Sequence, residues 1–272
     1  LGSPEPFAGF VTRASWSTGI GKPSFGSLIP NENVNDNARR VTVNNPKLNP
    51  QYANSYDLAA EYYLAPQGMV SVGVFRKKIS DYIFTDTSQT IGSGAGNGFD
   101  GEYEGYSLAT QNNGGFAKIE GMELSYQQQL TFLPGSLKGF GLNANFTSLR
   151  TEGDYGGGVV LTTNSLPNFL NKSGSAGLSY RGYGFDVRLA AIFRGEHLRT
   201  NSTNPALVRY RSAKTMWNWK SRYAVSRRLS IYLDVENIMS VAVNSSYLLY
   251  PDRVDDVEVM NTKIMAGVTG RF

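Results

Sequence analysis

The chain has 272 residues, 40% of them hydrophobic and 18% charged, with 30 Gly, 16 Tyr and 14 Phe, a composition poorer in charge and richer in aromatic residues than that of a typical soluble domain. Its net charge of +4 comes from 26 basic residues interspersed with 22 acidic ones, so the basic run of a nucleic-acid-binding protein is missing. The lack of cysteine excludes disulfides and cysteine-ligated metal centres, and no run of about 18 apolar residues forms a transmembrane helix.

Apolar and polar residues alternate at a spacing of two along most of the chain, as in strands whose two faces differ. The clearest example predicts Leu142, Ala144 and Phe146 on one face and Asn143 and Asn145 on the other. The ten predicted strands lie near residues 7–17, 52–64, 69–84, 115–130, 138–150, 172–180, 184–196, 213–225, 228–240 and 262–272.

The connections alternate between compact turns and long polar segments. The compact turns fall at residues 65–68, 133–136, 181–184 and 226–228, and the long segments near 18–51, 85–114, 151–171, 197–212 and 241–261. Outer-membrane barrels have short periplasmic turns and long extracellular loops, and tilted strands of about ten residues cross a bilayer. The sequence therefore predicts an all-β, antiparallel, up-and-down transmembrane barrel.

For any single strand, a soluble antiparallel sheet with one face in a protein core explains the alternation equally well. Aromatic residues near strand ends, such as Tyr62, Tyr82, Phe84 and Trp217, fit either core packing or an interfacial girdle. The repetition over ten segments favours the barrel.

Polar residues at the alternate positions are expected to face a lumen, where water or a plug solvates them. Their simplest role is the solubility of the lumen wall, and we expect contact with a plug more often than contact with substrate. These candidates are Asp57, Glu61, Glu123, Gln127, Asn143, Asn145, Arg188, Lys220, Arg222, Asp234 and Glu236.

Catalysis has little support in the sequence. The only histidine, His197, lies at a predicted strand end near Glu196 and Arg199, and no Gly-x-Ser-x-Gly motif accompanies it. That motif is not obligatory in outer-membrane hydrolases, but the position favours a loop residue, so we expect no enzyme.

Cofactors are not expected either. The acidic loop residues Asp252, Asp255, Asp256 and Glu258 fit a solvated loop better than a site for a hard cation. The glycines at 94–98 and 156–158 lack the strand-to-helix context of a phosphate-binding loop.

The last predicted strand places its apolar residues on one face and ends on an aromatic residue. These residues, Ile264, Ala266, Val268 and the terminal Phe272, resemble the C-terminal signal by which outer-membrane proteins are handed to the barrel-assembly machinery.

A set of segments in chain order is similar to the barrel of the TonB-dependent receptors. They are residues 45–50 (NPKLNP), 55–64 (SYDLAAEYYL), 74–83 (VFRKKISDYI), 113–126 (NGGFAKIEGMELSY), 166–169 (LPNF), 234–238 (DVENI) and 270–272 (GRF). No single segment is diagnostic, but together they cover nearly the whole chain in the expected order.

The resemblance implies that residues 1–272 are the C-terminal part of a barrel of about 22 strands, roughly its last ten. The N-terminal plug, its TonB box and the first part of the barrel are missing from the sequence, and the start at Leu1, without an initiator Met or signal peptide, agrees with this expectation.

The implied function is uptake of a scarce nutrient, such as an iron-siderophore, across the outer membrane of a Gram-negative-type bacterium. The implied partners are outer-membrane lipid, the TonB complex through the absent plug, the barrel-assembly machinery and a small ligand of unknown identity, but not nucleic acid. A passive porin or structural barrel is the alternative, followed by a soluble β-rich carbohydrate-binding or adhesion protein.

Overall fold

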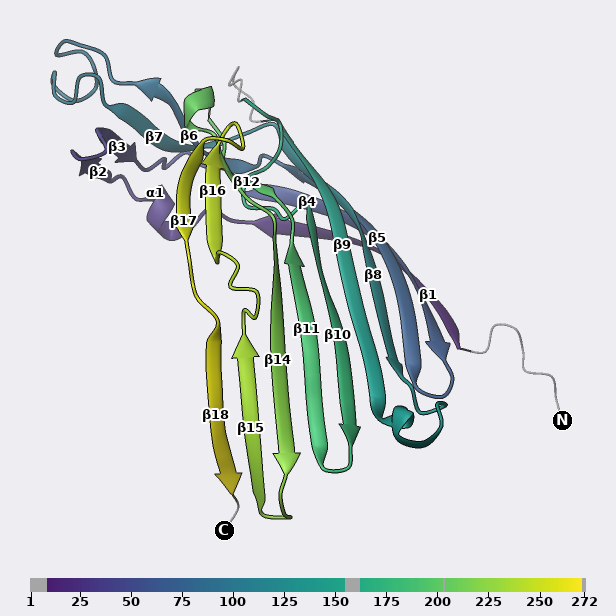
Figure 1. Cartoon of the computed structure of the whole chain (residues 1–272). Coiled ribbons are helices and arrows are strands. Elements are labelled where there is room, and N and C mark those ends of the chain that lie inside the picture. The colour runs from purple at the N-terminus through teal and green to yellow at the C-terminus, as the bar shows by residue number, and fades with distance from the viewer. Residues whose placement is uncertain (1–8, 155–161, 203, 271–272) are drawn as a thin grey trace.

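The computed structural model describes residues 9–154, 162–202 and 204–270. Ten long strands form one antiparallel sheet with neighbours adjacent in the order of the chain, which confirms the ten predicted strands (Figure 1). Their bounds are β1 (Phe10–Gly21), β4 (Gln51–Leu64), β5 (Gly68–Ser80), β8 (Phe116–Gln129), β9 (Phe140–Asp154), β10 (Lys172–Gly182), β11 (Phe185–Arg194), β14 (Lys214–Ala224), β15 (Leu229–Glu236) and β18 (Lys263–Gly270).

The sheet has a turn end and a loop end. The turn end carries the short connections β4–β5, β10–β11 and β14–β15 and the longer β8–β9 connection, which holds the 3-10 helix η1 (Gly135–Gly139). The loop end carries the long segments, the one-turn helix α1 (Phe25–Leu28) and the 3-10 helix η2 (Pro205–Leu207). Within the described ranges, no helix is both long and apolar enough to cross a bilayer.

Two further four-stranded sheets form in segments that the sequence predicts as loops. The loop-end sheets have the orders β2-β3-β7-β6 and β12-β13-β16-β17. Their strands are β2 (Glu32–Asn35), β3 (Arg40–Val43), β6 (Ile83–Thr90), β7 (Ser107–Asn113), β12 (His197–Thr200), β13 (Arg209–Arg211), β16 (Asn244–Leu248) and β17 (Val254–Glu258). These strands have three to eight residues and some join distant segments, so local alternation does not reveal them.

The register gives the long sheet two chemically different faces. Residues opposite each other on neighbouring antiparallel strands project to the same face. Leu142 lies opposite Leu178, Leu178 opposite Leu189, and Leu189 opposite Trp219. We call the side with these residues the apolar face and the other side the polar face.

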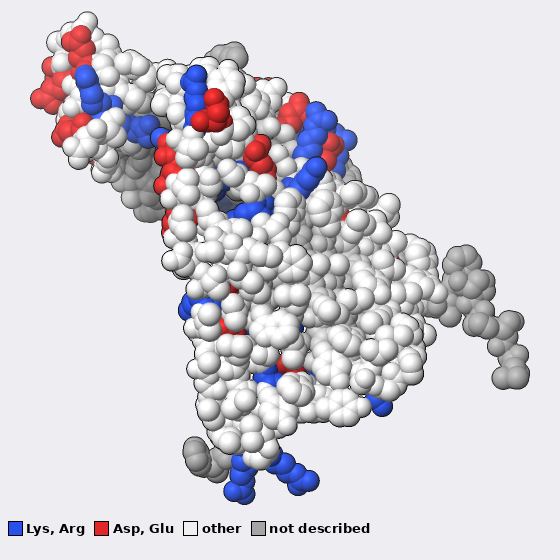
Figure 2. Space-filling model, viewed as in Figure 1, with Lys and Arg blue, Asp and Glu red and all other residues white. Residues whose placement is uncertain are grey.

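Charged residues occur on the apolar face only near the loop end. They are Arg76, Lys78, Lys118, Glu120, Arg150, Glu152, Asp154 and Lys172. Below them, from Phe140 to Ser148 on β9, the eight residue steps span about 27 Å at about 3.4 Å each. This length matches the apolar band of about 25 Å in outer-membrane barrels. Figure 2 shows the corresponding broad, mostly uncharged surface between charged ends.

The long sheet has almost no buried core of its own. Of the buried hydrophobic residues described, only Ala117 belongs to it, and the others lie in the loop-end segments. One cluster joins Phe84, Ala117 and Leu166, with Phe169 packed against it. On the apolar face, by contrast, Ile264 is 67% exposed. The loop end is therefore packed like a soluble domain, whereas the apolar face lies open to its surroundings.

Candidate functional site

The eleven polar residues singled out from the sequence share the polar face. Arg188 lies opposite Lys220, and Lys220 lies opposite Asp234. Gln127 lies opposite Asn143 in the same way on β8 and β9. The same register places all of them opposite the apolar side: Asp57, Glu61, Glu123, Gln127, Asn143, Asn145, Arg188, Lys220, Arg222, Asp234 and Glu236.

The structure does not gather these residues into one site. Six strands of the sheet separate Asp57 and Glu61 on β4 from Asp234 and Glu236 on β15. Each finds a local environment; Glu61, for example, accepts a hydrogen bond from Arg13 on β1. The polar face is therefore an extended surface, and one cavity near each of its two ends gathers basic side chains.

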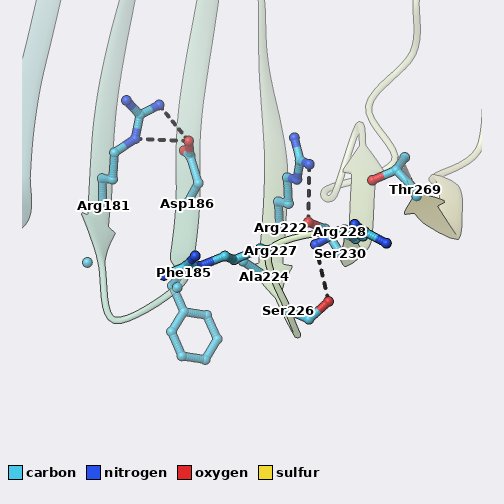
Figure 3. Close-up of a pocket in the computed structure, with 13 residues that line it drawn as sticks. Arg181, Phe185, Asp186, Arg222, Ala224, Ser226, Arg227, Arg228, Ser230 and Thr269 are labelled. Carbon is cyan, nitrogen blue, oxygen red and sulfur yellow. Dashed lines mark hydrogen bonds and ion pairs between the residues drawn. The ribbon is translucent and has the colours of Figure 1, made fainter. Parts of the chain in front are cut away.

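A first concentration lies at the turn end, where a cavity of about 670 Å³ opens between β10, β11, β14, β15 and β18. Four arginines line it, and among the described residues Asp186 is the only carboxylate side chain that does so. Arg181 donates to Asp186 through both Nε, at 3.1 Å, and Nη2, at 2.6 Å. Arg222 donates to the Ser230 hydroxyl at 3.1 Å, and Figure 3 shows these groups on their neighbouring strands.

The cavity at the turn end keeps a positive excess because the remaining arginines, Arg227 and Arg228, lie in the β14–β15 turn. Strand alternation points to Arg222 but not to Arg181, Arg227 or Arg228, which stand at or beyond strand ends. In the sequence, these three arginines are marked only by their position in two compact turns that contain basic residues.

A second concentration lies at the loop end of the same face. Arg194, the last residue of β11, stands opposite Lys214, the first residue of β14. His197 on β12 stands opposite Arg211 on β13. These four residues and the segment 241–245 line a cavity of about 350 Å³, which we call the basic pocket.

Contacts with the 241–245 segment fix two of the basic side chains. Arg211 Nη1 donates to Asn244 Oδ1 at 2.8 Å, and Lys214 Nζ donates to the carbonyl oxygen of Val243. The amide of Asn244 also donates to the Glu258 carboxylate. Sequence reasoning found His197 here but missed its basic neighbours, because pairing between short strands brings them together.

Glu196 contributes to a tyrosine pair beside the basic pocket. Tyr210 and Tyr247 stack with ring centroids 5.6 Å apart and planes 14° from parallel, and Tyr247 is buried. Burial, followed by a hydrogen bond to Glu196, raises the pKa of the Tyr247 phenol far above its ordinary value. Through Glu196, this tyrosine pair connects the second loop-end sheet with the segment between β11 and β12.

Two of the acidic loop residues, Asp255 and Glu258, take part in protein contacts. Asp255 Oδ2 lies 3.1 Å from Arg209 Nε and accepts from the Ser246 hydroxyl at 3.3 Å. Across the described part of the chain, no three His, Cys, Asp or Glu side chains converge as a possible metal site. The residues 156–158 and Phe272 lie outside the described residues.

Sequence comparison identifies the fold family of this two-faced sheet. The profile described as "TonB dependent receptor-like, beta-barrel" matches residues 5–238. The chain belongs to this family. A search of curated proteins gives no match.

Solved TonB-dependent receptors have a similar fold at low sequence identity. A mutant ferric enterobactin receptor from Pseudomonas aeruginosa aligns with a TM-score of 0.66 at 14% identity, over 97% of this chain and 38% of that chain. The copper transporter OprC gives 0.65 at 13%, over 97% and 38%. The ferric-catecholate import receptor Fiu from E. coli gives 0.64 at 14%, over 97% and 33%.

These comparisons relate the chain to a part of its relatives. The TonB-dependent receptor chain spans less than two fifths of the length of these three proteins. The ligands in their names differ, from ferric catecholates to copper, and the likeness at this identity concerns the fold alone.

Proposed function

We propose that the chain forms the C-terminal ten strands of the barrel of an outer-membrane receptor in a Gram-negative-type bacterium. The receptor takes up a scarce nutrient, such as an iron-siderophore, with energy from the TonB complex acting on an N-terminal plug. The main observation in support is that the sheet has a continuous apolar face without a protein core packed against it in the described residues. Exposed patches of this extent mark an interface with lipid or protein rather than a free surface in water.

In this proposal hydrocarbon covers the apolar face, and the polar face lines the lumen. The turn end lies in the periplasm and the loop end lies outside the cell, as in outer-membrane barrels generally. Water and the plug solvate the eleven polar residues, while the packed loop-end sheets hold the ligand-binding surface. A passive porin shares the same two-faced wall, so energy dependence is what distinguishes the two functions.

Location is tested on the protein expressed from its complete reading frame with an epitope tag. We expect it to sediment with outer membranes, to resist extraction by carbonate and to require detergent for release. A pool that remains soluble after disruption of the cells would contradict the membrane location and favour a soluble β-rich protein.

Transport is tested by comparing cells with and without the receptor for accumulation of radiolabelled ferric enterobactin, ferric citrate and cobalamin. We expect receptor-dependent uptake of at least one of them, abolished by a protonophore or by loss of the TonB complex. Receptor-dependent uptake that continues under both treatments would instead establish a passive pore, and no receptor-dependent uptake of the three would count against this nutrient class.

A further inference from the structure

The basic pocket gathers positive charge without a matching negative group. Arg194, Arg211 and Lys214 line it together with His197, and none of the described lining residues is Asp or Glu. Within the described residues, none of the three permanent cations forms an ion pair. The pocket therefore differs from the mid-height of the polar face, where Lys220 lies 4.0 Å from Asp234.

Two carboxylates, Glu196 and Glu258, act on His197 and Lys214 from outside the lining of the pocket. Glu196 accepts a hydrogen bond from Tyr247 on the tyrosine side. Glu258 accepts from Asn244, and the other end of the Asn244 amide accepts from Arg211. Glu258 thus reaches the pocket through a neutral amide, which leaves the guanidinium without a direct counter-charge.

The surroundings of His197 in the basic pocket lower its pKa. Burial lowers the pKa of His197 below its ordinary value, and the charges of Arg211 and Arg194 lower it further. The Gly195 carbonyl and Glu196 act in the opposite direction. Like charges that share a small, partly desolvated space repel one another, and a bound anion removes this repulsion.

We propose that the basic pocket binds a multiply charged oxyanion, of carboxylate, catecholate or phosphate type, carried by the ligand of this receptor. The forked guanidinium groups of Arg194 and Arg211 suit paired oxygens, and Lys214 adds a point charge. The volume of about 350 Å³ lies at the small end of ligand pockets, so it holds one anionic part of a large ligand.

This inference rests on the proposed receptor function for the source of the anion. Lipid phosphates of the outer leaflet have the same chemistry and are the other possible source. Arg194 and Lys214 project from the polar face, on the side away from the lipid-facing residues. This position favours an anion that arrives from water.

The test uses the full-length receptor purified in a neutral, lipid-free detergent. Binding of citrate and of inorganic phosphate is measured by calorimetry for the wild type, Arg194→Gln and Arg211→Gln. We expect each variant to bind the better anion about tenfold more weakly, because a charge-assisted hydrogen bond is lost. Added salt is expected to weaken binding less in the variants than in the wild type.

Arg199→Gln is the matched control. Arg199 lies on β12 close to His197 in the chain but lines a different cavity, so this variant makes the same change in net charge outside the basic pocket. Arg194 forms no side-chain hydrogen bond within the described residues, so Arg194→Gln remains informative if Arg211→Gln lowers the amount of folded protein.

The outcomes separate the possibilities. Binding that falls in both pocket variants but not in Arg199→Gln supports the site. If citrate and phosphate both fail to bind, or bind equally to every variant, the proposal is overturned, and so it is if only phosphorylated lipid in vesicles competes for the pocket. The binding assay does not depend on transport. If the receptor binds the anion as expected but its uptake activity is insensitive to the protonophore, only the proposed function is overturned.

Discussion

Leu189 and Arg188 are neighbours in the chain, yet their side chains occupy opposite faces of the sheet. Leu189 pairs with Leu178 and Trp219, whereas Arg188 pairs with Ser179 and Lys220. Whether a position along the strand is odd or even therefore determines to which face of the sheet its side chain projects. A single substitution therefore tests which solvent each face meets.

A charge placed at Leu189, near the middle of β11, is expected to destabilise the membrane-inserted barrel by about 2 to 4 kcal/mol. Leu189→Arg supplies this charge, and the same charge in Asn143→Arg on the polar face is expected to be tolerated. The measurement is the free energy of unfolding in lipid vesicles by denaturant titration. Similar losses for both variants would refute the assignment of lipid and lumen.

His197 predicts how anion binding to the basic pocket depends on pH. Burial lowers its pKa below the ordinary 6.5, Arg211 and Arg194 lower it further, and the Gly195 carbonyl and Glu196 raise it. A bound anion favours the imidazolium and raises this pKa, so affinity is unchanged above the raised pKa and increases as the pH falls through it.

We therefore expect citrate to bind the full-length receptor several-fold more tightly at mildly acidic than at neutral pH, after correction for protonation of citrate itself. His197→Gln should remove most of this increase and leave affinity at neutral pH nearly unchanged. The check is calorimetry across the pH series, and an identical profile for the two proteins would exclude His197 from the response.

At the scale of elements, long strands are predictable and short ones are not. All ten long strands follow from alternation, because each shows apolar and polar residues in turn. The limits shift where local conformation intervenes: β15 ends at Glu236 instead of near residue 240, since Asn237 and Ser240 have positive φ values of 54° and 51°. The eleven polar-face residues follow from the same alternation, but the basic pocket does not, because its cations meet through the short strands.

The β10–β11 turn shows how one element sets the register. Gly182 pairs with Phe185, so the loop consists of Tyr183 and Gly184, with φ values of 51° and 81°. Two central residues with positive φ define a type I′ turn, which matches the twist of the strands it joins. Adding a Cβ at Gly184 would bring it within 3.4 Å of the Ala224 carbonyl oxygen.

Gly184→Val is expected to destabilise the barrel by about 1 to 2 kcal/mol, because a β-branched residue is strained at this φ. Tyr183→Asn should have the opposite sign, since asparagine tolerates a positive φ. Thermal unfolding of the receptor in detergent measures both. Equal melting temperatures for both variants would show that the turn does not limit stability.

The whole molecule divides into a packed loop end and a wall that relies on its surroundings. Hydrophobic burial stabilises the loop end internally, but the wall gains the same stabilisation only when lipid covers its apolar face. Assembly should therefore depend on delivery to the membrane as much as on the chain's own packing.

The C-terminal residues provide a test of delivery. Ile264, Ala266 and Val268 lie on the apolar face opposite Val235, Leu233 and Ile231, and Phe272 follows beyond the described residues. We expect Phe272→Ser to lower the amount of receptor in the outer membrane severalfold, measured by quantitative immunoblotting of membrane fractions. Thr269→Ser, on the polar face of the same strand, is the control, and unchanged levels of Phe272→Ser would remove the proposed assembly signal.

The unpaired edges of the wall restrict how it closes. Strand β1 starts and β18 finishes at the turn end, and within the described residues each has a hydrogen-bonded neighbour on one side only. Any further strands that complete the barrel in up-and-down order must therefore begin and end at the turn end. Only an even number of additional strands does so, which makes the strand parity of the complete cylinder a property already determined by this segment.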